Sequence, residues 1–293
     1  MTRQRLRPAR LLQRLTMASS CLICLALMGA SRGSITKLTL DSDAPVVELF
    51  DGMSKDQIDV RLVAQNAHEG KIFVTNKTDK PLTVAVPKGL VGVPVLAQIG
   101  FNGGNNGNLF GQNQFNGQNG QNNGQTQAVG GNASPLGPNG AANGNAAFPN
   151  APNQFNNNFP NAIGFFSIPP EKTVQIGLNS VCLNYGRREP NAGLKYQLVK
   201  AESITTDPVL IQLLEDYSPR TNREAQQAAA WNLANGLSWE QIGQLTDQKV
   251  PGSPTPLFSA AQIKGAKALV DQAKKSAADR PKKSETVGSV VSR

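Results

Sequence analysis

The chain has 293 residues, three cysteines and a formal net charge of +9. That length leaves room for one or two domains. Residues 1–33 contain six arginines and no acidic residue, so the rest of the chain has 23 basic and 20 acidic residues and a net charge of only +3. Because the excess positive charge belongs to the first 33 residues, charge gives no support to nucleic-acid binding, and we predict no nucleic-acid partner.

Residues 1–33 have the order of a secretory signal peptide. A basic start is followed by the uncharged apolar segment 15–30 and then by small residues. The apolar segment has about 16 residues, fewer than the roughly 20 that a membrane-spanning helix needs. We therefore predict export to the periplasm or the extracellular space. The alternative is a retained inner-membrane anchor formed by residues 15–30.

Removal of the signal peptide also removes two of the three cysteines. Cys21 and Cys24 lie inside the apolar segment, so the exported chain keeps only Cys182. A single cysteine cannot form an internal disulfide bond, and the stability of the exported protein must come from packing.

Residues 38–200 contain short segments of β-type sequence. Alternation of apolar and polar residues at 58–63 is typical of a half-buried strand. Segments 71–75 and 81–87 flank the polar residues 76–80, which predicts a β-hairpin. Further strands are expected at 46–50, 163–168, 173–178, 180–185 and 195–199. Seven or eight short strands favour an antiparallel, immunoglobulin-like β-sandwich.

A long uncharged stretch interrupts this domain. No charged residue occurs from Gly89 to Pro170, and residues 102–160 are mostly Asn, Gly, Gln, Ala and Pro with a few Phe. Such a segment has too little apolar surface to offset the entropy of ordering it, so we predict a disordered insert between two strands. Asn- and Gln-rich sequence with spaced aromatic residues is also prone to weak self-association.

Helical signals begin after residue 206. Asp207 precedes Pro208 as an N-cap, and Gly236 is a typical helix stop. Capping boxes are expected at Thr221–Glu224, Ser238–Gln241 and Ser259–Gln262. We predict a small helical region at 207–277 and a disordered tail at 278–293. The fold class is therefore α+β.

Several phrases together resemble a group of uncharacterised exported proteins of planctomycete bacteria. The phrases are residues 76–84 (NKTDKPLTV), 92–98 (GVPVLAQ), 165–172 (FFSIPPEK), 181–183 (VCL) and 228–236 (AAAWNLANG). The resemblance covers about residues 45–245, with a variable insert. It implies export and a β-rich core followed by a helical part, and it implies no particular activity.

Two arrangements involving Cys182 could carry covalent chemistry. A cysteine nucleophile usually needs a histidine partner, and the only histidine is His68, in an expected turn. The alternative is that Cys182 is a small buried apolar residue on a strand, as unpaired cysteines often are.

The second arrangement pairs Cys182 with Gln227. Residues 227–231 (QAAAW) fit the Q-x-A-x-W pattern of Gram-positive thioester adhesin domains, which resemble this chain in placing a strand cysteine before a helical glutamine. In those domains the two side chains join as an internal thioester that acylates amines. This chain departs from the pattern in lacking aromatic-rich surroundings of the cysteine. The alternative for Trp231 and Trp239 is packing of helices onto the sheet.

Metal and cofactor signals are poor. One His and one Cys give no zinc spacing, and Asp41-Ser42-Asp43 lacks the glycine and final glutamate of a calcium loop. We predict no metal and no cofactor. Basic residues could meet anionic surfaces but are expected to serve solubility. They are Arg187, Arg188, Lys274, Lys275, Arg280, Lys282 and Lys283.

The function expected from these features is non-enzymatic binding or a structural role in the periplasm or cell envelope. The partner would be an envelope protein or a glycan, with weak self-association through residues 102–160. The alternative is thioester or thiol chemistry through Cys182.

Overall fold

The computed structural model describes residues 34–95, 126–134, 158–159, 161–247 and 254–288. The expected signal peptide and most of the Asn/Gly/Gln-rich sequence lie outside these residues.

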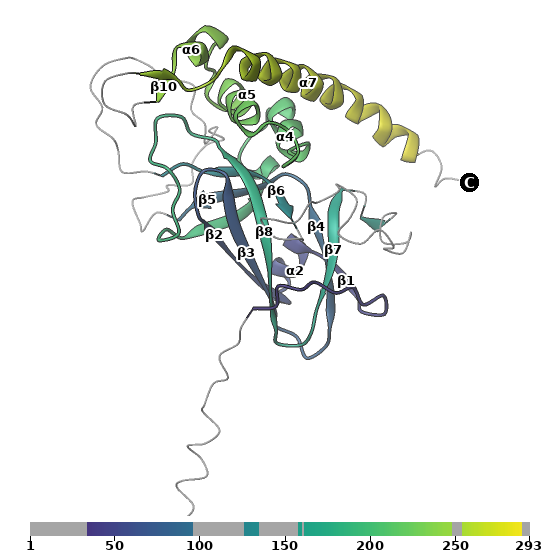
Figure 1. Cartoon of the computed structure of the whole chain (residues 1–293). Coiled ribbons are helices and arrows are strands. Elements are labelled where there is room, and N and C mark those ends of the chain that lie inside the picture. Colours follow the sequence, from purple (N-terminus) through teal and green to yellow (C-terminus); the bar gives the residue numbers. More distant parts are fainter. Residues whose placement is uncertain (1–33, 96–125, 135–157, 160, 248–253, 289–293) are drawn as a thin grey trace, which may run out of the picture. The chain divides into compact units, whose positions relative to one another are not determined.

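The centre of the structure is a closed β-barrel (Figure 1). Neighbouring strands pair in antiparallel fashion, and the last strand pairs with the first through Leu62 and Tyr196. In spatial order the strands are β2 (Ile58–Ala64), β3 (Glu69–Asn76), β8 (Thr173–Cys182), β6 (Val129–Ser134), β5 (Leu90–Pro94) and β9 (Tyr196–Lys200).

A three-stranded sheet packs against the barrel core. Strand β4 (Leu82–Pro87) lies between β1 (Val46–Glu48), to which it is parallel, and β7 (Ala162–Ile168), to which it is antiparallel. The short helix α2 (Leu49–Ser54) follows β1 directly. Inward aliphatic residues of the barrel and one face of this sheet form a single hydrophobic cluster. Its fully buried members include Leu62, Ile72, Val84, Phe166 and Ile176.

The expected immunoglobulin-like sandwich is therefore wrong. Alternating sequence predicts that each strand has one buried face, and this holds for β3, whose residues alternate between buried and half-buried. Alternation does not determine which strands become neighbours, nor whether the first and last strands pair. Here they do pair, which closes the main sheet into a barrel instead of leaving two open sheets.

The expected hairpin between 71–75 and 81–87 is wrong for the same reason. β3 pairs with β2 on one side and with β8 on the other, while the next segment, β4, joins the separate sheet. The side chain of Asn76 stabilises this change of sheet: its amide donates to the carbonyl oxygens of Lys80 and Ile168, at 2.7 and 3.0 Å.

Strand β6 lies within the stretch 102–160 that was expected to be disordered. It runs between β5 and β8, and residues 126–133 are buried. Two glycines allow the close approach: a Cβ atom at Gly131 would lie 2.1 Å from the carbonyl oxygen of Asn179, and one at Gly130 would lie 2.9 Å from a methyl group of Leu183. A Gly-Gly pair that looks like low-complexity sequence is thus a structural requirement of the barrel.

Four helices follow the barrel (Figure 1): α4 (Pro208–Glu215), α5 (Arg223–Asn235), α6 (Trp239–Gln244) and α7 (Ala260–Gly288). A two-stranded ribbon, β10 (Thr246–Asp247) with β11 (Thr255–Pro256), lies between α6 and α7. The helices share a second hydrophobic cluster with the outer face of the barrel. It includes Val181, Leu183, Leu214, Ala228 and Ala266.

Most of the expected helix caps are confirmed, because they depend on local sequence. The Asp207 side chain accepts from the Val209 amide, the Ser238 capping box is complete, and Gly236 has a left-handed φ of 66°. The N-cap of α5 is Asn222 and not Thr221. The tail expected to be disordered from residue 278 is helical to Gly288.

Candidate functional site

The candidate residues for covalent chemistry all lie near the end of β8. They are Cys182, Gln227 and His68. Strand β3 pairs with β8 as far as Asn179. The amide of the next residue, Ser180, donates a hydrogen bond to the His68 carbonyl oxygen at 2.9 Å. His68 belongs to the turn between β2 and β3. Because β3 ends there, the edge of β8 that faced it has no neighbouring strand at Cys182.

The side chain of Gln227, from helix α5, fills this edge. Its Oε1 accepts a hydrogen bond from the Cys182 amide at 2.9 Å, and its Nε2 donates to the Cys182 carbonyl oxygen at 2.8 Å. Cys182 is only 2% exposed and Gln227 only 5%. The carboxamide therefore occupies the place of a peptide group in a neighbouring strand, and it satisfies two buried backbone groups at once.

The thiol of Cys182 lies on the interior side of the barrel. Cys182 pairs with Val129, which belongs to the interior cluster, and cross-strand partners share one face of a sheet. Burial raises the pKa of the Cys182 thiol to about 12, and the negative charge of Glu189 adds to the shift. The thiol is therefore protonated at neutral pH.

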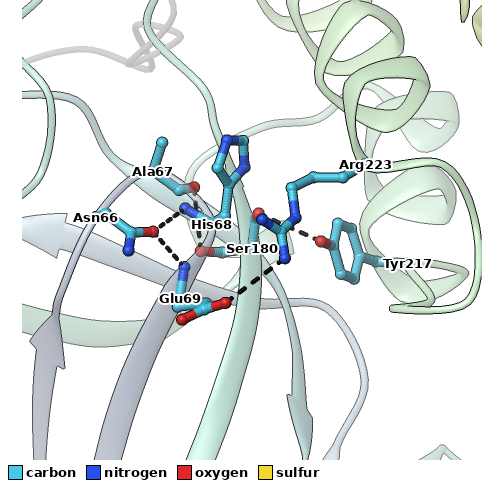
Figure 2. A network of polar contacts seen from close by, with 7 residues as sticks. All are labelled: Asn66, Ala67, His68, Glu69, Ser180, Tyr217 and Arg223. Atoms are coloured by element: carbon cyan, nitrogen blue, oxygen red, sulfur yellow. Dashed lines mark hydrogen bonds and ion pairs between the residues drawn. The ribbon is translucent and has the colours of Figure 1, made fainter. Parts of the chain in front are cut away.

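His68 lies in a polar network at the junction of the barrel and α5 (Figure 2). Asn66 shapes the turn, since its Oδ1 accepts from the amides of His68 and Glu69 at 2.8 and 3.0 Å. The Glu69 carboxylate then reaches Arg223, in the first turn of α5, at 3.5 Å. The His68 ring lies beside this ion pair.

The ring of His68 is partly buried, and its Nδ1 has no hydrogen-bond partner among the described residues. Burial lowers the pKa of His68, and the positive charge of Arg223 lowers it further, against the opposing effect of Glu224, Glu189 and Glu69. His68 is therefore neutral at neutral pH. It bonds to β8 through its backbone carbonyl, whereas a dyad with Cys182, considered as one alternative from the sequence, would use the ring.

Further contacts at the same junction also join side chains to backbone. The Tyr217 hydroxyl donates to the Ser180 carbonyl oxygen at 3.3 Å, and the Ser180 hydroxyl donates to the Ala67 carbonyl oxygen at 3.4 Å (Figure 2). Asn235, at the end of α5, accepts from the Tyr185 amide at 3.0 Å. Helix α5 is thus bonded to β8 and the residues after it through side chains near both of its ends.

Asn132 is the residue that sequence reasoning missed most clearly. Its Nδ2 donates to the carbonyl oxygens of Glu215 and Tyr217, at 2.8 and 3.0 Å, and its Oδ1 accepts from the Gly89 amide at 2.8 Å. It therefore joins β6 to the end of α4 and to the start of β5. Asn132 is surrounded by asparagines of similar sequence context, so nothing local distinguishes it.

The two tryptophans lie in the helical part, as the packing interpretation expects. Trp231 makes edge contacts with Tyr185 and Phe258, with ring centroids 4.9 and 5.9 Å apart. Lys267 lies over the Trp239 ring at 5.7 Å.

The described residues show no cluster of metal ligands and no helix suited to crossing a membrane. No three His, Cys, Asp or Glu side chains among them are close enough to hold a metal ion. The Asp41 side chain accepts from the Asp43 amide in a local turn at 3.0 Å. None of the helices within the described ranges combines the length and apolar character of a membrane span.

Of the basic residues noted in the sequence, Arg187 and Arg188 are exposed, whereas Arg280 is bonded to Gln212 and Glu215 of α4. Arg280 thereby joins α7 to α4. One of the basic residues that were expected to serve solubility therefore has a structural role.

Comparison of the chain with protein-family models, with curated proteins and with solved structures gives no match. The functional proposal therefore rests on the geometry of the site and on the sequence pattern.

Proposed function

We propose that this is an exported protein of the periplasm or cell envelope that binds a partner, or supports a structure, without catalysing a reaction. The observation that carries the proposal is the position of β6. This strand divides the Asn/Gly/Gln-rich sequence into two segments, 96–125 and 135–157. Each segment begins and ends close to a strand: the first connects β5 to β6, and the second connects β6 to β7.

The two ends of the first segment are neighbours in the barrel. β5 and β6 are antiparallel, and Gly92 pairs with Val129. Val95, the last described residue before the segment, is 53% exposed and bonds through its amide to Lys195 at 2.8 Å. The first segment thus has both ends on the barrel, and the second runs from the barrel to β7 of the three-stranded sheet. Long uncharged segments held at both ends by packed strands are suited to contacting a partner, since loops on a rigid scaffold commonly carry binding function.

The chemistry of these segments favours an uncharged partner surface. They contain no charged residue, many carboxamides and several phenylalanines. Such composition is typical of self-association and of contacts with polar, uncharged surfaces. An envelope protein, a glycan or a second copy of this chain fits that description.

The export part of the proposal rests on the signal-like sequence and on the resemblance to exported planctomycete proteins. Fractionation of the source cell, followed by N-terminal sequencing of the isolated protein, tests it. We expect a periplasmic or extracellular chain that begins near Ser34. An intact Met1 on a membrane-bound chain would support the retained anchor at 15–30, and an intact Met1 on a cytosolic chain would contradict export.

The binding part is tested by two separate loop replacements that spare β6. Residues 98–123 in one variant, and 137–155 in another, are exchanged for a short Gly/Ser linker. We expect both variants to fold, because loop closure depends only weakly on length. Sedimentation velocity then compares self-association, and affinity capture from envelope extracts compares partners. If both variants assemble and capture partners as the full chain does, these segments are not the binding elements.

A further inference from the structure

Helix α7 carries the net positive charge of the chain that follows residue 33. Residues 260–288 include seven basic and three acidic residues, which gives the helix a net charge of +4. Residues 34–259 include 15 basic and 17 acidic residues, a net charge of −2. The positive charge is therefore concentrated on one helix, and the rest of the chain is slightly acidic.

The two sides of α7 have different surroundings. The helix lies across α4 and α5 (Figure 1), and its buried side faces the helical cluster. The residues of this side are Ala266, Val270 and Ala273. Four exposed lysines, which we call the lysine row, are Lys264, Lys267, Lys274 and Lys275. With 3.6 residues per turn, the row occupies about 100° of the helix circumference and does not overlap the buried side.

The lysines of the row have only weak contacts with the rest of the chain. Lys274 lies 3.8 Å from Asp271, and the two side chains are 60% and 68% exposed. Asp271 is the one acidic residue within the row. Lys267 lies over the Trp239 ring at 5.7 Å. Exposed ion pairs of this kind contribute little stability, so the ammonium groups are available to a partner.

We propose that the lysine row of α7 docks on the surface of a membrane that contains anionic phospholipids. Such a surface attracts nearby lysines, and each lysine held close to it raises the affinity about fivefold. The inference goes beyond the proposed function: it uses residues other than the uncharged segments, and it needs from that proposal only the envelope location.

The shape of the row suits a flat surface. Lys264 and Lys275 are about 16 Å apart along a helix, so the charges follow a nearly straight line. Ala268, between them, is exposed and short, which allows the helix to lie close to a plane. The exposed residues of α7 within the described range include no large apolar side chain, and docking therefore needs no insertion into the bilayer.

The residue type of the row also favours lipid headgroups. A lysine ammonium is a point charge on a flexible stem, whereas arginine presents a planar fork that recognises phosphates with fixed geometry. A row of lysines therefore favours attraction to a charged surface over recognition of one particular phosphate group. Because this attraction is electrostatic, added salt weakens it.

The first test is flotation of residues 34–293, which contain every described residue, with phospholipid vesicles. We expect binding to vesicles of equal parts phosphatidylglycerol and phosphatidylcholine, and none to phosphatidylcholine alone. Three glutamine substitutions in the row should weaken binding about 100-fold. They are Lys264→Gln, Lys274→Gln and Lys275→Gln.

The matched control removes the same charge from exposed lysines outside α7, and we expect a change below about fivefold. Its substitutions are Lys55→Gln, Lys80→Gln and Lys172→Gln. Circular dichroism should show that both triple variants are folded. Equal losses in the two variants would mean that net charge alone is responsible, and they would overturn the proposal. Failure of the unchanged chain to prefer anionic vesicles would overturn it too, and would mean that the lysines serve solubility.

The second test needs no variant. Acetylation of the unchanged chain by an N-hydroxysuccinimide ester, followed by peptide mass spectrometry, measures how freely each lysine reacts. We expect the anionic vesicles to protect Lys264, Lys274 and Lys275, and to leave Lys55, Lys80 and Lys172 reactive. Uniform protection of all six would overturn the proposal. Heparin, a soluble polyanion, is the comparison: equal protection of the row by heparin would overturn the assignment to a membrane surface.

Discussion

The barrel interior and the barrel–helix junction are stabilised by different kinds of contact. The interior is filled by aliphatic and aromatic side chains, and the strands around it are bonded backbone to backbone. At the junction, buried carboxamides bond to backbone groups: Asn132 to the end of α4, and Gln227 and Asn235 to β8 and its extension. The interior therefore depends on shape and close approach, and the junction depends on a few polar groups, each of which satisfies buried partners.

The largest loss of stability is expected at Gly131, where β6 lies very close to the backbone of β8. In Gly131→Ala, the new Cβ would lie 2.1 Å from the Asn179 carbonyl oxygen, so β6 or β8 must move. We expect a loss of more than about 3 kcal/mol in the free energy of unfolding. The matched control is Gly193→Ala, at an exposed turn where the nearest atom belongs to the Asn191 side chain, with a change below about 1 kcal/mol. Equal, small losses in urea denaturation would show that β6 is not a tightly packed barrel strand.

The next largest loss of stability is expected at Asn132, in the barrel–helix junction. Asn132→Ala removes three hydrogen bonds and leaves the buried Gly89 amide without its partner. We expect a loss of about 2–4 kcal/mol. Both tryptophans lie in α5 and α6, so their fluorescence reports on the helices, while far-UV circular dichroism reports on the whole chain. If the junction is where the two regions separate, tryptophan fluorescence should change at lower urea than circular dichroism in this variant; coincident transitions would show that the regions unfold together.

The features that could be predicted from the sequence are those set by residues close together in the chain. Helix caps at Asp207 and Ser238, and the alternation of β3, depend on neighbours in the chain, and they are confirmed. The pairing of strands is not local. Two strands with the same alternation can become neighbours or belong to different sheets, which is why both the sandwich and the hairpin were wrong.

The site was predictable only in part. Sequence reasoning singled out Cys182, Gln227 and His68, and the structure brings Gln227 to Cys182 through the backbone of the cysteine. Asn132 and β6 could not be recognised, because in a segment rich in Asn and Gly the residues that a barrel requires resemble those around them. A short buried strand in such a segment is specified by its distant neighbours, and it has too few apolar residues to show a period.

A smaller loss at the junction is expected for Gln227→Leu. The substitution keeps a side chain of similar size but leaves the Cys182 amide and carbonyl without partners. We expect a loss of about 1–3 kcal/mol, and faster hydrogen exchange of the Cys182 amide. The same substitution at the exposed Gln272 of α7 is the control, with a change within about 0.5 kcal/mol. If the two variants were equally stable, Gln227 would not be part of what joins α5 to β8.

The smallest effect concerns the pH dependence of the same junction. His68 has a lowered pKa in the folded chain, first because it is buried and then because Arg223 lies near it. Above the ordinary histidine pKa of 6.5, both folded and unfolded chains carry a neutral His68. As the pH falls below 6.5, the unfolded chain binds the proton first, so the folded chain loses stability until the pH passes the lowered pKa.

His68→Gln should remove this part of the pH dependence. Glu215 acts in the opposite sense: burial raises the pKa of its carboxyl, so its contribution to stability is lost as the pH rises from 4.5 through the raised value. The difference between wild type and His68→Gln, measured by urea denaturation from pH 7.5 downward, cancels the Glu215 effect and isolates the histidine. We expect the variant to lose less stability than wild type below pH 6.5. Parallel curves would mean that the His68 ring is accessible enough to take up its proton as freely in the folded chain as in the unfolded one.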